Sequence, residues 1–337
     1  MNIGDRRIGE KFPPYVIAEI GVNHDGSVER AIELTDAAAN AGADAVKLQL
    51  FRTDLLMSRA AKLAAYQAAA GETDPLAMLR RLELSIEEMA QVVERAHARG
   101  IHAIVTVFSV ELVAEAETLA WDAYKSASPD IINRPLLEAM AGTGRPLIVS
   151  TGASTLAEVE RAWSWLKHAR RRLALLQCVS SYPVPEGQDG LGGIPALRQK
   201  FRRQPVGYSD HTDTLDTAWR AVACGASVLE KHFTYDKSAA GPDHAASATL
   251  EELITYVNIA KVRWMEPRGV THYTPTGIGP SPDWCTARVE PRAEKAVLDC
   301  ERDVREVSRQ SLTTSRAMDA GHVLTAGDLT VKRPGTG

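Results

Sequence analysis

The feature that most constrains the fold of this chain is a repeated alternation of short apolar runs with helical patterns. Eight runs read as strands, at 16–20, 44–50, 102–108, 122–126, 146–150, 173–179, 205–209 and 227–233. Helical patterns lie between them, such as Val28–Asn40 and Leu156–His168, and the last runs from about Leu250 to Trp264. Strands joined through a helix are parallel neighbours. Eight such units in 337 residues predict an α/β fold, a (β/α)8 TIM barrel, and favour it over a doubly wound sheet.

The chain divides into a barrel and a C-terminal appendage. We assign residues 1–268 to the barrel and residues 269–310 to a linker, rich in Pro, Gly and Thr at its start, that holds a short helix near 292–300. Residues 311–337 change to short β-like runs separated by turns, which predict a small β-rich domain. Within the barrel, residues 52–84 form a long irregular stretch after a strand, where we expect a lid or a binding loop.

Composition places the chain among ordinary globular proteins. Hydrophobic residues make up 45% and charged residues 24% of it, and its net charge of −4 offers no general basic field for nucleic acid or anionic lipid. We find no signal peptide and no apolar run long enough to span a bilayer. The 4 cysteines show no CxxC spacing, so we expect reduced thiols and a cytoplasmic location. From the charge and the lack of a long apolar run we expect neither a nucleic-acid nor a membrane partner.

Two histidines stand at the ends of neighbouring predicted strands. His211 follows one strand and His232 lies at the end of the next, with Asp210 and Glu230 beside them. Because parallel neighbours end at the same rim, the two imidazoles could hold a divalent metal ion. Taken singly, each histidine is more simply a satisfied polar residue at a strand end. The pair on adjacent strands favours the metal site.

Further polar residues gather where the strands end, which is where TIM barrels carry their active sites. They are Glu19, Lys47, Gln49, Thr106, Lys125, Ser128, Ser150, Ser180, Tyr182, Ser209 and Glu230. A buried lysine is costly without an anion, and hydroxyls beside a lysine suit a phosphate. Any one serine is more simply a helix N-cap, and Lys47 could instead form an internal ion pair with Glu19. The whole ring nevertheless predicts a phosphorylated anionic substrate together with a metal.

Seven short motifs, in order and spacing, identify a family resemblance. They are Ile17-Ala-Glu-Ile-Gly-Val-Asn-His-Asp-Gly26, Val46-Lys-Leu-Gln49, Ser150-Thr-Gly152, Cys178-Val-Ser-Ser-Tyr-Pro183, Gly207-Tyr-Ser-Asp-His-Thr212, Leu229-Glu-Lys-His-Phe-Thr234 and Gly241-Pro-Asp243. Over nearly its whole length the chain resembles the N-acetylneuraminate (sialic acid) synthase family, which includes the pseudaminic and legionaminic acid synthases. Residues 311–337 resemble the start of that family's antifreeze-like (SAF, β-clip) domain.

The resemblance implies a transferase. The family condenses phosphoenolpyruvate with the open-chain form of an N-acylated sugar such as N-acetylmannosamine and releases phosphate. It implies a divalent metal cofactor, manganese first, with magnesium or cobalt as alternatives. It also implies a domain-swapped homodimer.

The resemblance also assigns roles residue by residue. Lys47 and Thr106 match contacts to the carboxylate of phosphoenolpyruvate, while Lys125, Ser128, Ser150, Ser180 and Ser209 match its phosphate site. The sugar contacts are matched by Gln49, Tyr182, Asp243 and Arg333, the last reaching over the active site of the other subunit. His211 and His232 match the metal ligands. Glu19 is the candidate general base, and Glu230 could orient a metal-bound group.

Two alternative functions stay open at this stage. One is another phosphoenolpyruvate-dependent synthase of sugar acids, and the other is a catalytically silent sugar-binding barrel. The second is motivated by the expectation that about half of the antifreeze-like domain is missing after Gly337. An assay for phosphate release with several N-acyl sugars separates these readings.

Overall fold

The computed structural model describes residues 1–265, 273–274, 277–278 and 293–334. Its centre is a closed barrel of parallel strands in the order β10-β3-β4-β5-β6-β7-β8-β9. These strands are β3 (Tyr15–Glu19), β4 (Ala45–Leu50), β5 (His102–Val107), β6 (Ala123–Ser126), β7 (Leu147–Ser150), β8 (Leu173–Cys178), β9 (Val206–Asp210) and β10 (Val228–His232). The predicted TIM barrel is confirmed, and the doubly wound sheet is wrong because β10 pairs with β3 and closes the sheet.

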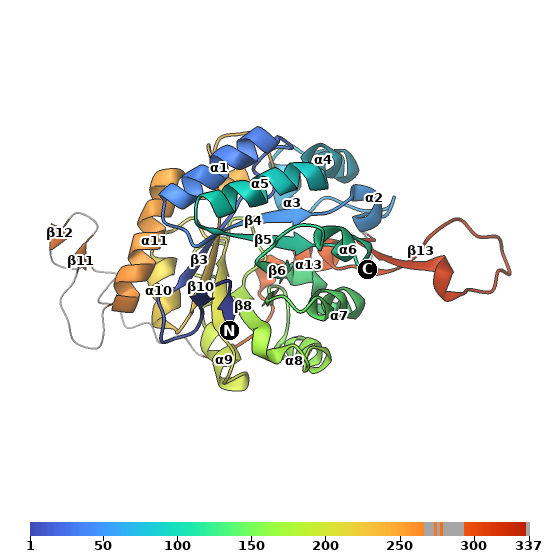
Figure 1. Cartoon of the computed structure of the whole chain (residues 1–337). Coiled ribbons are helices and arrows are strands. Elements are labelled where there is room, and N and C mark those ends of the chain that lie inside the picture. Colours follow the sequence, from blue (N-terminus) through green and yellow to red (C-terminus); the bar gives the residue numbers. More distant parts are fainter. Residues whose placement is uncertain (266–272, 275–276, 279–292, 335–337) are drawn as a thin grey trace.

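A layer of helices surrounds the barrel (Figure 1). It comprises α1 (Val28–Asn40), α5 (Ile86–Ala98), α6 (Glu111–Ala116), α7 (Arg134–Gly142), α8 (Leu156–Trp165), α9 (Gly193–Lys200), α10 (Thr217–Ala223) and α11 (Leu250–Met265). Successive strand residues point to opposite faces, so alternate side chains such as Val46 and Leu48 pack outward against these helices in one large apolar cluster. Among the helices of the described residues, none combines the length and apolar character of a membrane span.

Local signals explain where several helices begin. The α1 helix spans the predicted residues, and the Ser27 hydroxyl accepts a hydrogen bond from the Arg30 amide at its start. Ser85 and Glu88 form the expected capping box at α5. Thr155 and Glu158 form another at α8. Each box satisfies amide groups that have no partner within the helix.

Toward the amino ends of the strands, the barrel interior holds an apolar cluster and is closed by the N-terminal hairpin. Inward-facing residues such as Ile17, Ile104 and Ile148 form one buried cluster there. Ile3 and Ile8 belong to the same cluster. They come from the hairpin of β1 (Asn2–Ile3) and β2 (Arg6–Arg7) and the residue that follows it. The hairpin therefore plugs this end of the barrel.

The segment after β4 is more ordered than its sequence suggests. Instead of an irregular loop, residues 52–84 contain α2 (Thr53–Leu56), α3 (Ala65–Ala69) and α4 (Pro75–Leu82). Asp74 caps α4, and Pro75 occupies its first turn, a start signal that the sequence analysis did not use. Leu56, Met78 and Leu82 build a separate apolar cluster with Phe51 and Phe108. The segment is therefore a small helical wall beside the barrel.

The predicted linker lies partly outside the described residues. Its described part contains β11 (Tyr273–Thr274), β12 (Gly277–Ile278) and α13 (Arg302–Ser308). The helix expected near 292–300 is wrong, because residues 293–298 are extended or irregular and helical turns begin only at 299. Tertiary contacts override helix propensity here, since the Glu294 amide donates to the Gly192 carbonyl.

The chain then forms an antiparallel pair, β13 (Ser311–Thr314) and β14 (Leu329–Lys332), in register from Ser311–Lys332 to Thr314–Leu329. β13 and the residues that follow it project away from the barrel (Figure 1). Leu312, Val323 and Leu324 are exposed there. The antifreeze-like assignment and the domain boundaries stay predictions.

Gly207 of β9 tests the packing of the barrel wall. A Cβ at Gly207 would lie 2.3 Å from the Val228 carbonyl oxygen and 2.6 Å from a Leu176 methyl group. We therefore predict that Gly207→Ala lowers the free energy of unfolding by about 1–3 kcal/mol or more. Gly142→Ala is the control, because a Cβ at Gly142 meets nothing within 4 Å. Equal stability of both variants in denaturant titrations would contradict this packing.

Candidate functional site

The predicted site residues come together in one pocket at the carboxyl ends of the barrel strands. Every residue assigned a role from the sequence lines it: Glu19, Lys47, Gln49, Thr106, Lys125, Ser128, Ser150, Ser180, Tyr182, Ser209, His211, Glu230, His232, Asp243 and Arg333. The barrel register explains much of this. Glu19 lies opposite both His232 and Lys47, and Thr106 lies opposite both Gln49 and Lys125. Residues at one level of the barrel therefore share its interior.

A buried charge network forms the floor of the pocket. Lys47 pairs with Glu19, as the alternative interpretation of that lysine predicted, and its Nζ lies 3.7 Å from Glu230 Oε2. Lys125 Nζ lies 3.5 Å from Glu230 Oε1. Lys47 Nζ also donates to the Thr106 hydroxyl at 3.0 Å. Both ammonium groups thus point into the pocket, each beside a carboxylate.

Burial and these neighbours shift the protonation of the network. Burial lowers the pKa of Lys47 to about 8, although Glu230 opposes the shift. Burial alone would raise the pKa of Glu230, but Lys125 and Lys47 lower it to about 2. Glu230 is therefore ionised at neutral pH, and Lys47 is poised to lose its proton in mild alkali.

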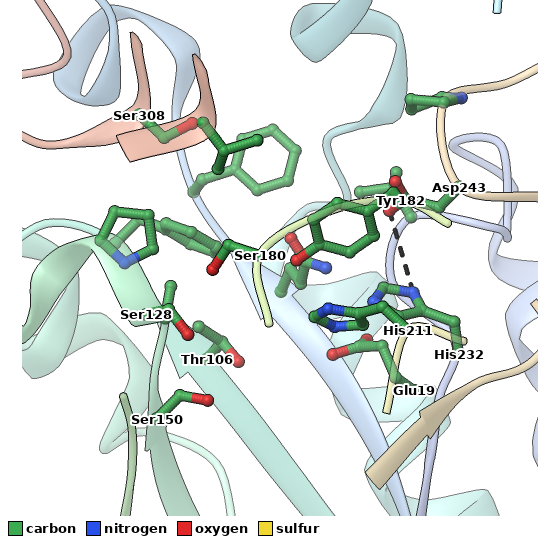
Figure 2. Close-up of a pocket in the computed structure, with 18 of the residues that line it drawn as sticks. Glu19, Thr106, Ser128, Ser150, Ser180, Tyr182, His211, His232, Asp243 and Ser308 are labelled. Carbon is green, nitrogen blue, oxygen red and sulfur yellow. Dashed lines mark ion pairs between the residues drawn. The ribbon is translucent and has the colours of Figure 1, made fainter. Parts of the chain in front are cut away.

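Hydroxyl groups line one side of the pocket, where Ser128, Ser150 and Ser180 lie together (Figure 2). The oxygens Ser150 Oγ and Ser180 Oγ are buried and have no hydrogen-bond partner among the described residues. Ser128 Oγ accepts from the Gly152 amide at 3.0 Å. Unpartnered buried hydroxyls beside Lys125 provide donors for the oxygens of an anion.

The two histidines occupy the opposite side. Their ring centroids are 5.4 Å apart, and the Tyr182 ring lies 4.1 Å from that of His211. His211 Nδ1 donates to the Val179 carbonyl at 2.8 Å, which leaves Nε2 unprotonated in the neutral ring. His232 Nδ1 is buried without a hydrogen-bond partner among the described residues, 3.9 Å from Asp243 Oδ2 (Figure 2).

The histidine pair provides some, but not all, of the ligands that a metal ion needs. Burial lowers the pKa of His232 well below its usual value, and His211 and Lys47 lower it further, so the ring is a neutral donor. Burial raises the pKa of Asp243 to about 6. Within the described ranges no group of three or more His, Cys, Asp or Glu side chains is arranged to hold a metal. The protein thus offers two imidazoles and a neighbouring carboxylate.

Asp210 does not belong to this site, which corrects the expectation that it flanks the metal. Its Oδ2 accepts from the Thr217 hydroxyl at 2.6 Å and lies 3.4 Å from Lys231 Nζ. Asp210 follows the inward-facing Ser209, so the strand period of two turns it toward the helices. Ser209 instead donates to Glu230 Oε1 at 2.8 Å.

Arg333 lines the pocket of its own barrel in this single chain. Its amide donates to the Leu56 carbonyl at 2.8 Å, and its carbonyl accepts from the Ser58 amide at 3.0 Å. The guanidinium carbon lies 5.5 Å from the centre of the Phe108 ring. The placement over a partner subunit's site stays a prediction, since one chain does not test it.

Several residues that line the pocket come from outside the strand ends and were not predicted from the sequence. Tyr66 and Gln67 come from α3, whose N-cap residue, Ala64, has no side-chain acceptor to signal a helix start. The Tyr66 and Tyr182 rings lie 4.8 Å apart. Val304 and Ser308 come from α13, far along the chain from the barrel strands. No periodicity in the sequence identifies these residues, because tertiary packing alone brings them to the pocket.

A closed parallel barrel with this polar pocket at its strand ends defines a protein of the (β/α)8 enzyme class. Residues 34–266 match the family model described as the NeuB family. The chain belongs to the NeuB family.

Its relatives include named synthases. The chain is 36% identical to N,N'-diacetyllegionaminic acid synthase of Legionella pneumophila, over 98% of this chain and 88% of the relative. The solved N-acetylneuraminic acid (sialic acid) synthetase of Leptospira borgpetersenii is similar with a TM-score of 0.71 and 32% identity, over 82% of this chain and 93% of that one. The spore coat polysaccharide biosynthesis protein spsE of Bacillus subtilis is similar with a TM-score of 0.80 and 27% identity, over 99% and 88% respectively. The resemblance to the sialic acid synthase family is thereby confirmed.

The pKa of Lys47 generates a prediction about pH. If the charged ammonium binds an anionic substrate, kcat/KM for phosphoenolpyruvate should fall as pH rises through about 8, where the free protein loses that proton. Lys47→Arg should remove this alkaline fall, because a guanidinium stays charged. A wild-type profile that stays flat up to about pH 10, near the ordinary lysine pKa, would count against this role.

Proposed function

We propose that the protein is a nonulosonic acid synthase that condenses phosphoenolpyruvate with the open-chain aldehyde of an N-acylated sugar and releases phosphate. The single observation that supports this most is the pairing, in one pocket of a NeuB-family barrel, of two lysines and unpartnered hydroxyls with a buried histidine pair. The first group suits a phosphorylated carboxylic acid. The second suits a metal and an aldehyde.

Phosphoenolpyruvate would lie along the lysine and serine side. Lys47 and Thr106 would hold its carboxylate, and Lys125 with Ser128, Ser150, Ser180 and Ser209 would hold its phosphate. The two ammonium groups would neutralise the anion and fix the reacting carbon, which lowers the barrier through orientation and electrostatic stabilisation.

The acceptor would enter from the helical wall. Gln49, Tyr182, Asp243 and Arg333 would contact its hydroxyl and amide groups, with the apolar Leu56, Met78 and Leu82 beside them in the pocket lining. Planar guanidinium donors suit such oxygens. Relatives at similar identity carry different sugar names, so the acceptor is left at the level of an N-acylated sugar.

The bond changes balance as one condensation. The enol carbon of phosphoenolpyruvate attacks the aldehyde carbon and forms the new C–C bond, while the aldehyde oxygen takes a proton. Water adds to the neighbouring cationic carbon and loses a proton to a base. The hydroxyl group formed there loses its own proton as the bond from that carbon to the phosphate oxygen breaks, which leaves a ketone and releases inorganic phosphate. Glu19, buried beside Lys47, is the proposed general base for that water or for opening of the sugar ring.

His211 and His232 would hold a divalent cation, manganese first and magnesium or cobalt as alternatives, and Glu230 lies beside them to orient its other ligands. When bound, such a cation polarises a carbonyl oxygen as a Lewis acid. The buried Nδ1 of His232, which has no hydrogen-bond partner among the described residues, and the Nδ1–H hydrogen bond that leaves Nε2 of neutral His211 unprotonated support these two ligands.

The direct test is an acceptor screen with phosphoenolpyruvate, in which phosphate release and product mass are both measured. A product whose mass equals the sum of acceptor, phosphoenolpyruvate and water, less phosphoric acid, supports the proposal. Product formation only from a phosphorylated aldose without an N-acyl group would favour another barrel synthase. Release of phosphate without any condensed product would show hydrolysis of phosphoenolpyruvate and would contradict the proposal. Sugar binding with no turnover in the presence of manganese would indicate a silent binding protein.

Metal dependence gives a second prediction. A chelator should abolish turnover, and manganese should restore it. His211→Ala and His232→Ala should each lower kcat by more than about a hundredfold without loss of the folded barrel. His97→Ala, which removes an imidazole paired with Asp122 outside the pocket, is the matched control and should retain turnover. Full activity of a verified metal-free sample would refute the metal role.

A further inference from the structure

The segment after the barrel crosses the pocket rim and touches the loops that carry the proposed phosphate ligands. We call residues 298–310 the strap. It contains η4 (Asp299–Glu301) and α13, and it lies beyond residue 266, where the family match ends. Val304 and Val307 pack against Ala64 on the helical wall. The strap therefore belongs to the folded body of the barrel domain.

Glu301 is the most buried charged residue of the strap, with 1% of its surface exposed. Its Oε1 accepts from the Ala153 amide at 2.5 Å and from the Ser180 amide at 2.8 Å. Its Oε2 accepts from the Leu298 amide at 2.9 Å within the strap. One carboxylate thus joins the loop after β7 to the loop after β8. Ser150 is the last residue of β7, directly before the first of these loops, and Ser180 lies in the second. Ser150 Oγ and Ser180 Oγ are the hydroxyls that have no hydrogen-bond partner in the described part of the chain.

The backbone of Ala153 independently indicates that the contact between Glu301 and the loop after β7 is constrained. Its φ of +48° lies in the left-handed region, where a non-glycine residue is strained and stays only if its surroundings hold it there. The strap holds it on both sides. Glu301 accepts from its amide, and Arg305 and Arg309 donate to its carbonyl. The same two arginines pair with Glu158 of α8, which ties them to the barrel.

The turn that contains Ala153 is also tightly packed. A Cβ at the preceding Gly152 would lie 2.3 Å from Ser180 Oγ and 2.7 Å from Ser128 Oγ. Two hydroxyl groups, one from η1 after β6 and one from the loop after β8, therefore converge on this glycine. A small shift of this turn would move the Ser128 and Ser180 hydroxyls relative to each other.

Gln310, at the other end of the strap, connects two further loops of the barrel rim in the same way. Its Nε2 donates to the Phe108 carbonyl at 2.9 Å and to Asp130 Oδ1 at 2.8 Å. Phe108 follows β5, and Asp130 lies in η1 (Ser128–Ile132) after β6. Glu301 and Gln310 together therefore contact four consecutive loops of the barrel rim.

We infer that the strap is a positioning element of the active site, and that Glu301 sets the spacing of the Ser150 and Ser180 loops around the substrate phosphate. This inference rests on the proposed function only for the identity of the bound anion, which is the phosphate group of phosphoenolpyruvate. Glu301 touches no substrate in this arrangement, because its carboxylate is used by backbone amides. Its effect should therefore fall on the affinity for phosphate groups and leave the metal ligands in place.

The test compares Glu301→Ala with Glu306→Ala, which removes an exposed carboxylate from the same strap. Calorimetry with inorganic phosphate, the KM for phosphoenolpyruvate and a manganese titration are measured for each full-length variant. We expect Glu301→Ala to weaken phosphate binding and raise this KM by about tenfold or more, with manganese affinity unchanged. Glu306→Ala should match the wild type in all three.

Glu301→Gln keeps an oxygen that can accept from the Ala153 and Ser180 amides, so it should recover most of the lost phosphate affinity. This variant replaces Glu301→Ala in the comparison if the alanine variant does not fold. Unchanged phosphate affinity in a folded Glu301→Ala protein, or a parallel loss of manganese binding, would overturn the inference. If the wild type neither turns over phosphoenolpyruvate nor binds phosphate, the proposed function fails instead.

Discussion

The structure depends on the burial of charge at one end of an otherwise apolar barrel. Lys47 pairs with Glu19, and Glu230 lies between Lys47 and Lys125. Burying any one of these ions alone would cost several kcal/mol, and together they offset much of that cost. The network is therefore stable only as a set, and an anion that enters it must compete with Glu19 and Glu230 for the lysines. That competition makes binding sensitive to the protonation of Lys47.

The remaining architecture protects this polar end. The N-terminal hairpin packs Ile3 and Ile8 into the opposite end of the barrel, away from the pocket. The helical wall after β4 and the strap after the barrel close two sides of that opening. Neither is part of the repeating strand and helix pattern. Enclosure by such additions excludes water and strengthens electrostatic contacts with a bound anion.

Much of the fold and the site could be predicted from the sequence. Lys47, Thr106 and Lys125 were predicted to share one site because each stands toward the carboxyl end of a predicted strand, where TIM barrels carry their active sites. What could not be predicted depends on contacts between distant segments. The strap has no apolar period that announces its contacts, and the helix expected near 292–300 lies further along the chain because residues such as Glu294 bind the barrel instead. Asp210 was wrongly predicted to flank the metal because it precedes His211 in the sequence. Its side chain occupies an outward position of the strand, against Thr217 and Lys231.

We propose that the rim holds a metal on its histidine side and a phosphate on its serine side. A crystal structure of the protein grown with manganese and phosphoenolpyruvate, with anomalous data collected to locate the metal, tests both halves of this proposal at once. We expect a manganese peak bound by His211 and His232 and a phosphate within hydrogen-bond distance of Ser150 Oγ and Ser180 Oγ. A metal bound elsewhere, or phosphoenolpyruvate outside this pocket, would contradict it.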